Sequence, residues 1–416
     1  MSTADAIFFP ARESLRLDER QYSPDLQAKL IETSLRTTSF AQAQELTMIW
    51  GGPAISSRHL GRVVEAIGDE LLEKRDAEVE DFTHHRRGPE GIDPVHELAA
   101  VFVDGGRVQP RDEPPGQGNG VHQPRWREDK VARLQTMSTT TYAIDPCPEP
   151  PACFLDPNRL SGLLDPGKIL EKTSESTVPP PMPPTATTTD RWQPEPLVRT
   201  CVATMRPSDE FRWMVQAEAR RRHFYTALRR AFVADGLAYN WTLWAKHFPD
   251  FVPILDFLHV ASYLYAAAKA LAQPDRAAQW VRDVWQGRVT EVTPQLLDAL
   301  TQAGVGDETL ADEHPLRAVQ KAANYLTHHA DKMDYPRYRR EGLPLTSSLM
   351  ESQIKEFHRR VKGTEKFWNP SNAEAMLQLL CWSLRDDGPT LADYMASRPG
   401  QPFRRTTRPE TPTVAA

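Results

Sequence analysis

The sequence has few of the features that mark secreted or membrane proteins. It contains only four cysteines in 416 residues, which excludes a disulfide scaffold and favours a reducing compartment. No apolar run approaches the roughly 20 residues that span a bilayer. The N-terminus has neither a basic start nor a long apolar core, so it does not predict a secretory signal. We therefore expect a cytoplasmic protein with no membrane partner.

The sequence also lacks a net positive charge, so its overall charge of −6 gives no argument for nucleic-acid binding. The local charge is different. Residues 332–366 contain nine Lys or Arg against five Asp or Glu, and residues 218–230 form a second basic cluster. A charge run is usually only a solvated surface. These two runs are of interest because they flank candidate carboxylates.

Residues 1–90 are predicted to form a helical N-terminal domain. Serines at candidate N-caps precede three helical patterns, and Gly51–Gly52–Pro53 ends the second of them. Two helices joined by a glycine-containing turn fit a helix-turn-helix, although any small helical bundle has a similar pattern. In a DNA-binding domain of this kind, Arg58 and Arg62 would face the groove.

Short apolar runs predict a mixed α/β fold in the middle of the chain. Strands are expected at 99–103, from Trp126, and at 197–205, 231–236 and 251–257, with a helix over 208–230. Three strands followed by alternating helices and strands give a mixed sheet with helices on its faces. The expected division is a core at 91–272 with a proline-rich surface insertion or linker at 143–196, a helical insertion at 273–340, C-terminal helices at 341–395, and a disordered tail at 396–416.

Three acidic residues stand out by their position. Asp104 and Asp235 end buried strands, and Glu351 begins a late helix. Two aspartates and a glutamate can hold a pair of Mg²⁺ or Mn²⁺ ions roughly 4 Å apart for displacement at phosphorus. Each acid also has a structural interpretation. The two Asp-Gly pairs are typical of turns, and Ser348 with Glu351 matches a capping box.

Asp256 and His259 form a further pair at the junction of a strand and a helix, one helical turn apart. Their structural interpretation is an aspartate N-cap and a buried, hydrogen-bonded histidine. Because Asp256 also ends a strand, it is an alternative to Asp235 as the second metal-binding acid.

Three stretches of the chain resemble bacterial insertion-sequence transposases. They are FVDGGRVQ at 102–109, the run at 232–271 that contains VADG and ILDFLH, and the run at 335–377 that contains SSLMESQIKEFHRRVKG. The resemblance is to DDE enzymes with an RNase H-like core, most closely the Kra-type insertion-sequence family, which is related to Mutator-like enzymes. It extends over most of the chain, from about residue 8 to residue 388.

The resemblance implies the roles of individual residues. It assigns the catalytic, metal-binding acids to Asp104, Asp235 and Glu351, and an auxiliary D-x-x-H motif to Asp256 and His259. It also implies a helical insertion before the glutamate. Near the site, phosphate contacts are expected from four basic residues of the late helix, and a displaced base would stack on Trp368. The four basic residues are Lys355, Arg359, Arg360 and Lys362.

The function predicted from the sequence is therefore DNA transposition. Strand cleavage at the end of an element would free a 3′-hydroxyl, which then attacks target DNA. DNA ends and target DNA are the expected partners, and pairing of two ends implies a homo-oligomer in the bacterial cytoplasm. Two alternatives stay open: a structure-specific RNase H-like nuclease that cuts without joining, and an inactive DNA-binding protein derived from a transposase.

Overall fold

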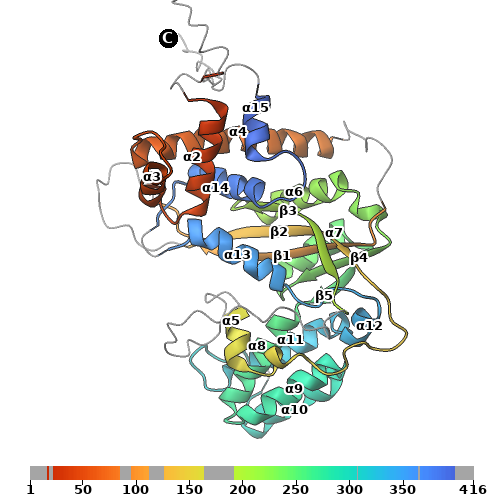
Figure 1. The fold of residues 1–416 in the computed structure, drawn as a ribbon. Helices are drawn as coiled ribbons and strands as arrows, with labels where there is room; N and C mark the ends of the chain where they lie inside the picture. Colours follow the sequence, from red (N-terminus) through yellow and green to blue (C-terminus); the bar gives the residue numbers. More distant parts are fainter. Residues whose placement is uncertain are drawn as a thin grey trace, which may run out of the picture.

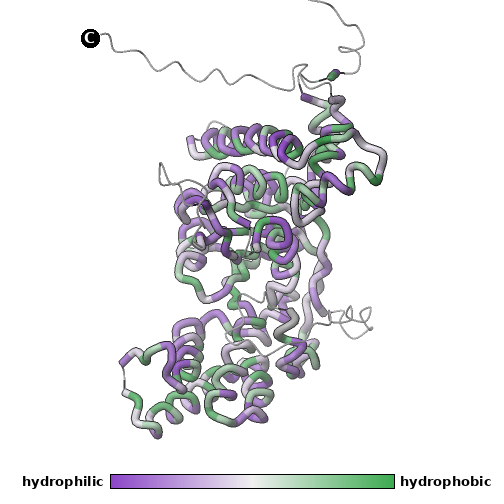
Figure 2. The backbone as a smooth tube through the Cα atoms, turned by 90° about the vertical axis from the view of Figure 1, so that its left-hand side faces the viewer, coloured by the Kyte–Doolittle hydropathy of each residue, from purple (hydrophilic) through white to green (hydrophobic). Residues whose placement is uncertain are grey.

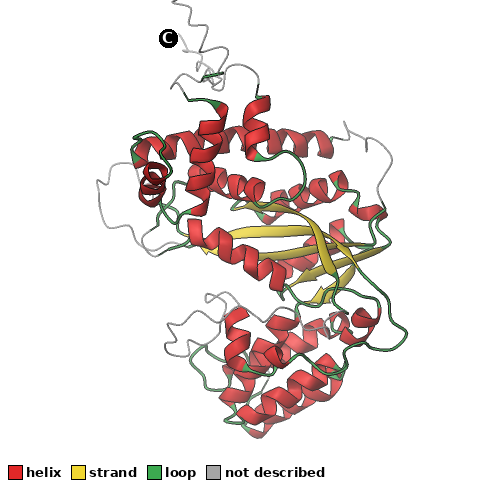
Figure 3. Ribbon diagram, viewed as in Figure 1, coloured by secondary structure: helices red, strands yellow, loops and turns green. Residues whose placement is uncertain are grey.

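The computed structural model describes residues 16–17, 22–84, 95–111, 126–163, 192–306, 308–363 and 366–398. A five-stranded sheet lies at the centre of the molecule with helices on both faces (Figures 1 and 3). N-terminal and C-terminal helices form a layer on one side of the sheet. A second group of helices projects from the edge of the sheet formed by β5.

The sheet has the strand order β3-β2-β1-β4-β5. Strand β2 is antiparallel to both of its neighbours, whereas β1, β4 and β5 run parallel to one another. This order and these directions are those of an RNase H-like core, and they confirm the predicted fold class. The strand bounds are β1 Leu98–Val108, β2 Arg127–Ser138, β3 Glu195–Thr204, β4 Arg229–Ala234 and β5 Val252–Leu255.

Both faces of the sheet are covered, so its central strands are apolar throughout rather than alternating. On β1, Phe102 belongs to one buried cluster, and its neighbours Val101 and Val103 belong to another on the opposite face. Helices α13 and α14 cover the first face and α6 and α7 the second. Their bounds are α6 Ser208–Arg221, α7 Ala238–His247, α13 Ser348–Val361 and α14 Pro370–Ser383.

The N-terminal helices begin at serine caps, as the sequence predicts. Ser23, Ser39 and Ser56 each accept a hydrogen bond from a backbone N–H in the first turn of α2, α3 and α4. Helix α4 packs against α14, and α2 packs against the C-terminal α15. The bounds are α2 Pro24–Arg36, α3 Phe40–Ile49, α4 Ser57–Thr83 and α15 Leu391–Ser397.

The predicted helical insertion forms a group of its own beyond β5, separated from the N-terminal layer by the sheet (Figure 2). Two of its tyrosines attach it to the sheet. Tyr335 donates a hydrogen bond to the Leu255 carbonyl at 2.9 Å, and Tyr338 donates one to the Pro253 carbonyl at 3.1 Å. The elements within the predicted bounds of 273–340 are α9 Pro274–Trp285, α10 Val289–Gln302, α11 Arg317–His329, the 3₁₀ turn η3 Ala330–Lys332, and α12 Tyr335–Arg340. Helix α8 (Phe257–Ala270), which precedes these bounds, packs against α9 and α11.

Two sequence predictions are corrected by the structure. The helix expected over 208–230 ends at Arg221, because His223 adopts a left-handed conformation (φ 56°) and the 3₁₀ turn η2 (Phe224–Thr226) leads directly into β4. The described part of the proline-rich segment also packs into the protein instead of forming a surface linker. Its 3₁₀ turn η1 (Ala152–Phe154) and helix α5 (Pro157–Leu163) bury Phe154 against Phe257 and Trp285.

The remaining half of that segment, 164–191, and the tail from 399 onward lie outside the described residues. Just before this point, Arg398 forms an ion pair with Glu70 of α4. No helix in the described ranges is both long enough and apolar enough to cross a bilayer.

The crossing of α4 and α14 depends on a glycine. A Cβ atom at Gly68 would lie 2.7 Å from the Ala375 Cβ and 2.9 Å from its carbonyl oxygen. We expect Gly68→Ala to lower the free energy of unfolding by about 1–3 kcal/mol, because the two helices must separate. Urea unfolding measures this change.

Gly61, on the same helix, is the matched control. A Cβ atom there would meet Phe40 at 3.5 Å, which is ordinary contact. Gly61→Ala should raise stability by up to about 1 kcal/mol through helix propensity. Equal effects of the two substitutions would contradict the packing argument.

Candidate metal centre

Three aspartates lie at the same level on three neighbouring parallel strands. Val103 of β1 pairs with Ala234 of β4, and Ala234 pairs with Leu255 of β5. Asp104 is the next residue of β1, and Asp235 and Asp256 directly follow β4 and β5. Because adjacent strands are about 4.8 Å apart, the three backbone positions span about 10 Å along one edge. We call these residues the aspartate row. It lies at the carboxyl end of β4 and β5, where open α/β sheets bind ligands.

Asp256 connects the sheet, α8 and α13. It caps α8, as its structural interpretation predicted, and its Oδ1 accepts hydrogen bonds from the backbone N–H groups of Leu258 at 3.1 Å and Ser347 at 3.0 Å. Its Oδ2 accepts from the Ser347 hydroxyl at 2.5 Å and from His259 Nδ1 at 2.6 Å. A carboxylate has about four lone-pair sites, so four donors fill the capacity of Asp256.

These donors decide the charge of Asp256. Its side chain is fully buried, and burial alone raises the pKa of a carboxyl group. The hydrogen bond and charge of His259, together with the hydrogen bonds from Ser347, outweigh burial, and the pKa of Asp256 is lowered. The Asp256 carboxylate is therefore ionised near neutral pH.

Glu351 reaches the same place from α13. Asp256, His259 and Glu351 each offer one possible ligand atom, and these three atoms lie within 4.8 Å of one another. All three residues are buried. Two carboxylates and an imidazole nitrogen make a donor set that can hold a divalent metal ion. Because His259 Nδ1 donates to Asp256, in the neutral ring Nε2 carries the lone pair that a cation takes. This arrangement fits a metal ion.

Glu351 does not act as a helix cap. The capping box predicted with Ser348 is absent, because α13 begins one residue earlier, with Ser347 as N-cap. The Ser347 side chain makes no cap hydrogen bond, since its hydroxyl is bound to Asp256. Glu351 is instead 1% exposed on the side of α13 that faces the aspartate row. Sequence reasoning missed Ser347, whose only signal was its place four residues before Glu351.

Asp104 and Asp235 lie outside the group of three ligand atoms around Glu351. Asp104 is buried in β1 and accepts a hydrogen bond from the Gly105 N–H at 2.7 Å. Asp235 is half-exposed, and its Oδ1 accepts from the Leu237 N–H at 3.0 Å and the Asn240 side chain at 2.7 Å. The backbone thus aligns both residues with Asp256, and Asp235 in addition orders the start of α7.

A second contact that the sequence did not indicate joins α13 to the sheet. His358, two turns after Glu351 on the same side of the helix, lies over Gly106, where a Cβ atom would be 1.9 Å from its Nε2. The same nitrogen is 3.6 Å from Oδ2 of Asp129, which is fully buried on β2. Glycine at position 106 is required by this close approach of the imidazole.

The residues predicted to bind DNA have different environments. Arg58 and Arg62 are exposed in the first turns of α4, and Lys355 and Arg359 are exposed on α13. Lys362 is half-buried at the C-cap of α13, and half-buried Trp368 donates its indole N–H to the Val361 carbonyl at 2.8 Å. Arg360 is 3% exposed, with its guanidinium 4.3 Å from the centre of the Phe40 ring.

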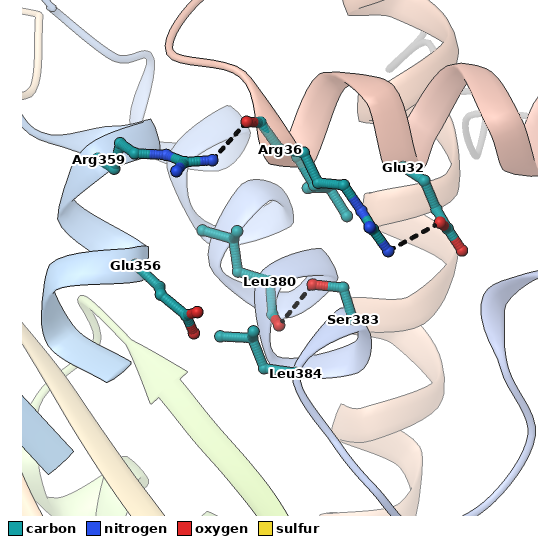
Figure 4. Close-up of a pocket in the computed structure, with 8 residues that line it drawn as sticks. Glu32, Arg36, Glu356, Arg359, Leu380, Ser383 and Leu384 are labelled. Carbon is teal, nitrogen blue, oxygen red and sulfur yellow. Dashed lines mark hydrogen bonds and ion pairs between the residues drawn. The ribbon is translucent and has the colours of Figure 1, made fainter. Parts of the chain in front are cut away.

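A separate cavity of about 220 Å³ lies between α2, α13 and α14 (Figure 4). Glu356 and Arg359 line it from a different side of α13 than Glu351, so the cavity is not part of the carboxylate site. Arg359 donates a hydrogen bond to the Arg36 carbonyl there. The other lining residues are Glu32, Leu35, Arg36, Leu380, Ser383 and Leu384.

The environment of Asp256 predicts a pH dependence of stability. Since its pKa is lowered on folding, its contribution is present above the unfolded value of about 4 and is lost as the pH falls below it. We expect Asp256→Asn to lower the free energy of unfolding by about 2 kcal/mol at pH 7. The variant should also show a smaller loss between pH 5 and pH 3 in urea titrations.

The exposed Asp298, changed to Asn, controls for the loss of one acidic group. If the wild-type protein and Asp256→Asn lose stability in parallel below pH 4, the Asp256 carboxylate is not the source of the pH dependence.

No protein-family model and no curated protein matches the sequence. Among solved structures, the chain is similar to the transposase in the Drosophila P element transposase strand transfer complex. The identity is 11%, the match covers 87% of this chain and 92% of that chain, and the TM-score is 0.35. The RNase H-like assignment rests on the strand order and strand directions given above.

Proposed function

We propose that this protein is a DDE transposase that cleaves and joins DNA by metal-dependent phosphoryl transfer. The observation that carries the proposal is the aspartate row together with Glu351. Helix α13 places Glu351 at the same edge of the sheet as the row. The sequence resemblance to Kra-type insertion-sequence transposases supports the same assignment. Acids at this edge of an RNase H-like sheet suit in-line displacement at a phosphodiester.

The proposed metal-binding acids are Asp104, Asp235 and Glu351. Asp256 is the weaker candidate for the second acid, because four hydrogen bonds already occupy its oxygens. Its proposed role is to hold Ser347 and His259, and thereby Glu351. When bound, Mg²⁺ or Mn²⁺ would stabilise the negative charge that develops at the reacting phosphate. The carboxylates fix the place of that charge, and burial of Glu351 excludes bulk water from one side.

The proposed DNA contacts are the exposed basic residues. Lys355 and Arg359 on α13, with Lys362 at its end, would bind phosphates close to the carboxylates, and Arg58 and Arg62 would bind a more distant part of the DNA. Arg360 is better suited to anchoring α13 on Phe40, because its guanidinium is buried. Trp368 would need to exchange its bond to Val361 before it could stack on a base.

Transposition would require the protein to pair two DNA ends, so we also propose that it acts as a homo-oligomer on DNA in the bacterial cytoplasm. The substrates would be the ends of an insertion sequence and a target DNA. A strand-transfer assay with precut ends separates this activity from that of a nuclease, which cuts but does not join.

We expect Asp104→Asn, Asp235→Asn and Glu351→Gln each to reduce Mg²⁺-dependent strand cleavage by more than about a hundredfold. Mutation of residues that only support a metal ligand already lowers activity by up to about a hundredfold, and the loss of a ligand itself should cost more. DNA affinity at fixed salt should stay close to wild type, because phosphate contacts supply most of it. Cleavage of labelled DNA ends and a gel-shift assay measure the two quantities.

Lys321→Ala is a control for surface charge in the helical insertion, where Lys321 pairs with Asp312. Two results would contradict the assignment of the metal-binding acids. One is strand cleavage by the Asp104→Asn or Glu351→Gln variant, and the other is wild-type cleavage that does not depend on a divalent ion.

A further inference from the structure

A buried carboxylate on β2 faces helix α13 just beyond the aspartate row. Asp129 is fully buried, and within the described residues neither of its carboxylate oxygens accepts a hydrogen bond. Its Oδ2 lies 3.6 Å from His358 Nε2, which is an ion-pair distance and too long for a hydrogen bond. Asp256 is equally buried but accepts four hydrogen bonds. The imidazole of His358, when protonated, offsets the buried charge of Asp129.

The strand register places this pair on the same face of the sheet as Asp104. Gly106 is two residues beyond Asp104 on β1, so the two positions share one face. Asp129 pairs with Gly106 across the β1–β2 ladder and therefore points to that face as well. A Cβ atom at Gly106 would lie 1.9 Å from His358 Nε2 and 3.0 Å from Asp129 Oδ1. This is the face on which α13 packs against β1 and β2 (Figure 1).

Three residues of α13 that matter for the site lie on one side of the helix. Glu351 follows Ser347 by four residues, and His358 follows Glu351 by seven, so the three lie within about 40° of one another around the helix axis. The hydrogen bonds from Ser347 to Asp256 hold the start of the helix. His358 contacts the sheet about 16 Å further along the axis. Glu351 therefore lies between two polar contacts with the sheet.

The stability of the fold does not account for the pair. Apolar side chains already bury α13 against the sheet, and apolar packing is non-directional. A buried ion pair can often be replaced by apolar residues without loss of stability. What such a pair can add is a defined orientation, because the helix must be turned so that His358 lies over Gly106. The same rotation turns Glu351 toward the face of β1 that carries Asp104.

We propose that the contact between His358 and Asp129 positions Glu351 for metal binding by fixing the rotation of α13 on the sheet. The inference rests on the proposed function, because it requires a cation at Glu351. Both members of the pair are positioning residues, since they act through the helix and do not touch the cation. Gly106 is part of the same contact, because a side chain there would displace the imidazole.

The test is the binding of Mn²⁺ by the full chain, measured by isothermal titration calorimetry, which gives both the affinity and the number of ions bound. We expect Asp129→Asn, His358→Gln and Gly106→Ala each to weaken Mn²⁺ affinity about ten- to a hundredfold, the range found for residues that support metal ligands. The number of ions bound should remain that of the wild type. If Asp129→Asn instead lowers this number by one, Asp129 binds a cation itself, and the positioning role is wrong.

Because removal of one charge from a buried pair can destabilise the fold, a double variant provides a second test. Asp129→Val combined with His358→Leu replaces both groups with apolar side chains, and the thermal midpoint should stay close to that of the wild type. Mn²⁺ affinity should still fall to the level of the single variants. A stable double variant that binds Mn²⁺ with wild-type affinity would overturn the inference.

Glu356→Gln is the matched control for the loss of one acidic group. Glu356 lines the separate cavity on another side of α13, so its substitution should leave Mn²⁺ affinity unchanged. Equal losses of affinity in Glu356→Gln and Asp129→Asn would indicate an effect of net charge alone and would contradict the positioning role.

Glu351→Gln separates this inference from the proposed function. If Glu351→Gln loses Mn²⁺ binding while the Asp129, His358 and Gly106 variants all keep wild-type affinity, only the positioning role is wrong. If the wild-type protein binds no Mn²⁺, the metal site fails, and this inference fails with it.

Discussion

The hydrogen bonds between Asp256 and Ser347 determine where Glu351 lies. They join the end of β5 to the start of α13 across 91 residues of sequence, and the Phe257 N–H strengthens the junction by donating to the Leu345 carbonyl at 3.0 Å. Because Glu351 lies one turn after Ser347, fixing the first residue fixes the second. The junction therefore places Glu351 through contacts that do not involve the helical insertion between them.

The junction also bears on how the acids divide their roles. An aspartate that accepts four hydrogen bonds is well suited to structural support. Asp256 is such a residue, and it orients His259 in the way that carboxylates orient metal-binding histidines. Asp104 accepts a hydrogen bond from the Gly105 N–H, and Asp235 accepts from the Leu237 N–H and the Asn240 side chain. The four donors around Asp256 are the reason for proposing Asp235, at the end of β4, as the second acid.

Much of the fold could be predicted from the sequence, because apolar runs such as Ala99 to Val103 have no stable place except a buried strand. Asp104 and Asp235 were found for the same reason, since they interrupt or end such runs. Local patterns failed where a distant contact decided the outcome. Ser348 fits a capping box, but the bond of Ser347 to Asp256 moved the start of α13. Prolines around Phe154 suggested a linker, but the ring is buried against Trp285.

The hydrogen bonds of Tyr335 and Tyr338 could not be predicted from such patterns, because the sequence does not show which carbonyls lie at the edge of the sheet. Tyr335 and Tyr338 donate to carbonyls of β5, the edge strand of the sheet in the described residues, and so satisfy backbone groups that would otherwise need water. Only the structure shows that these two tyrosines attach the helical insertion to β5.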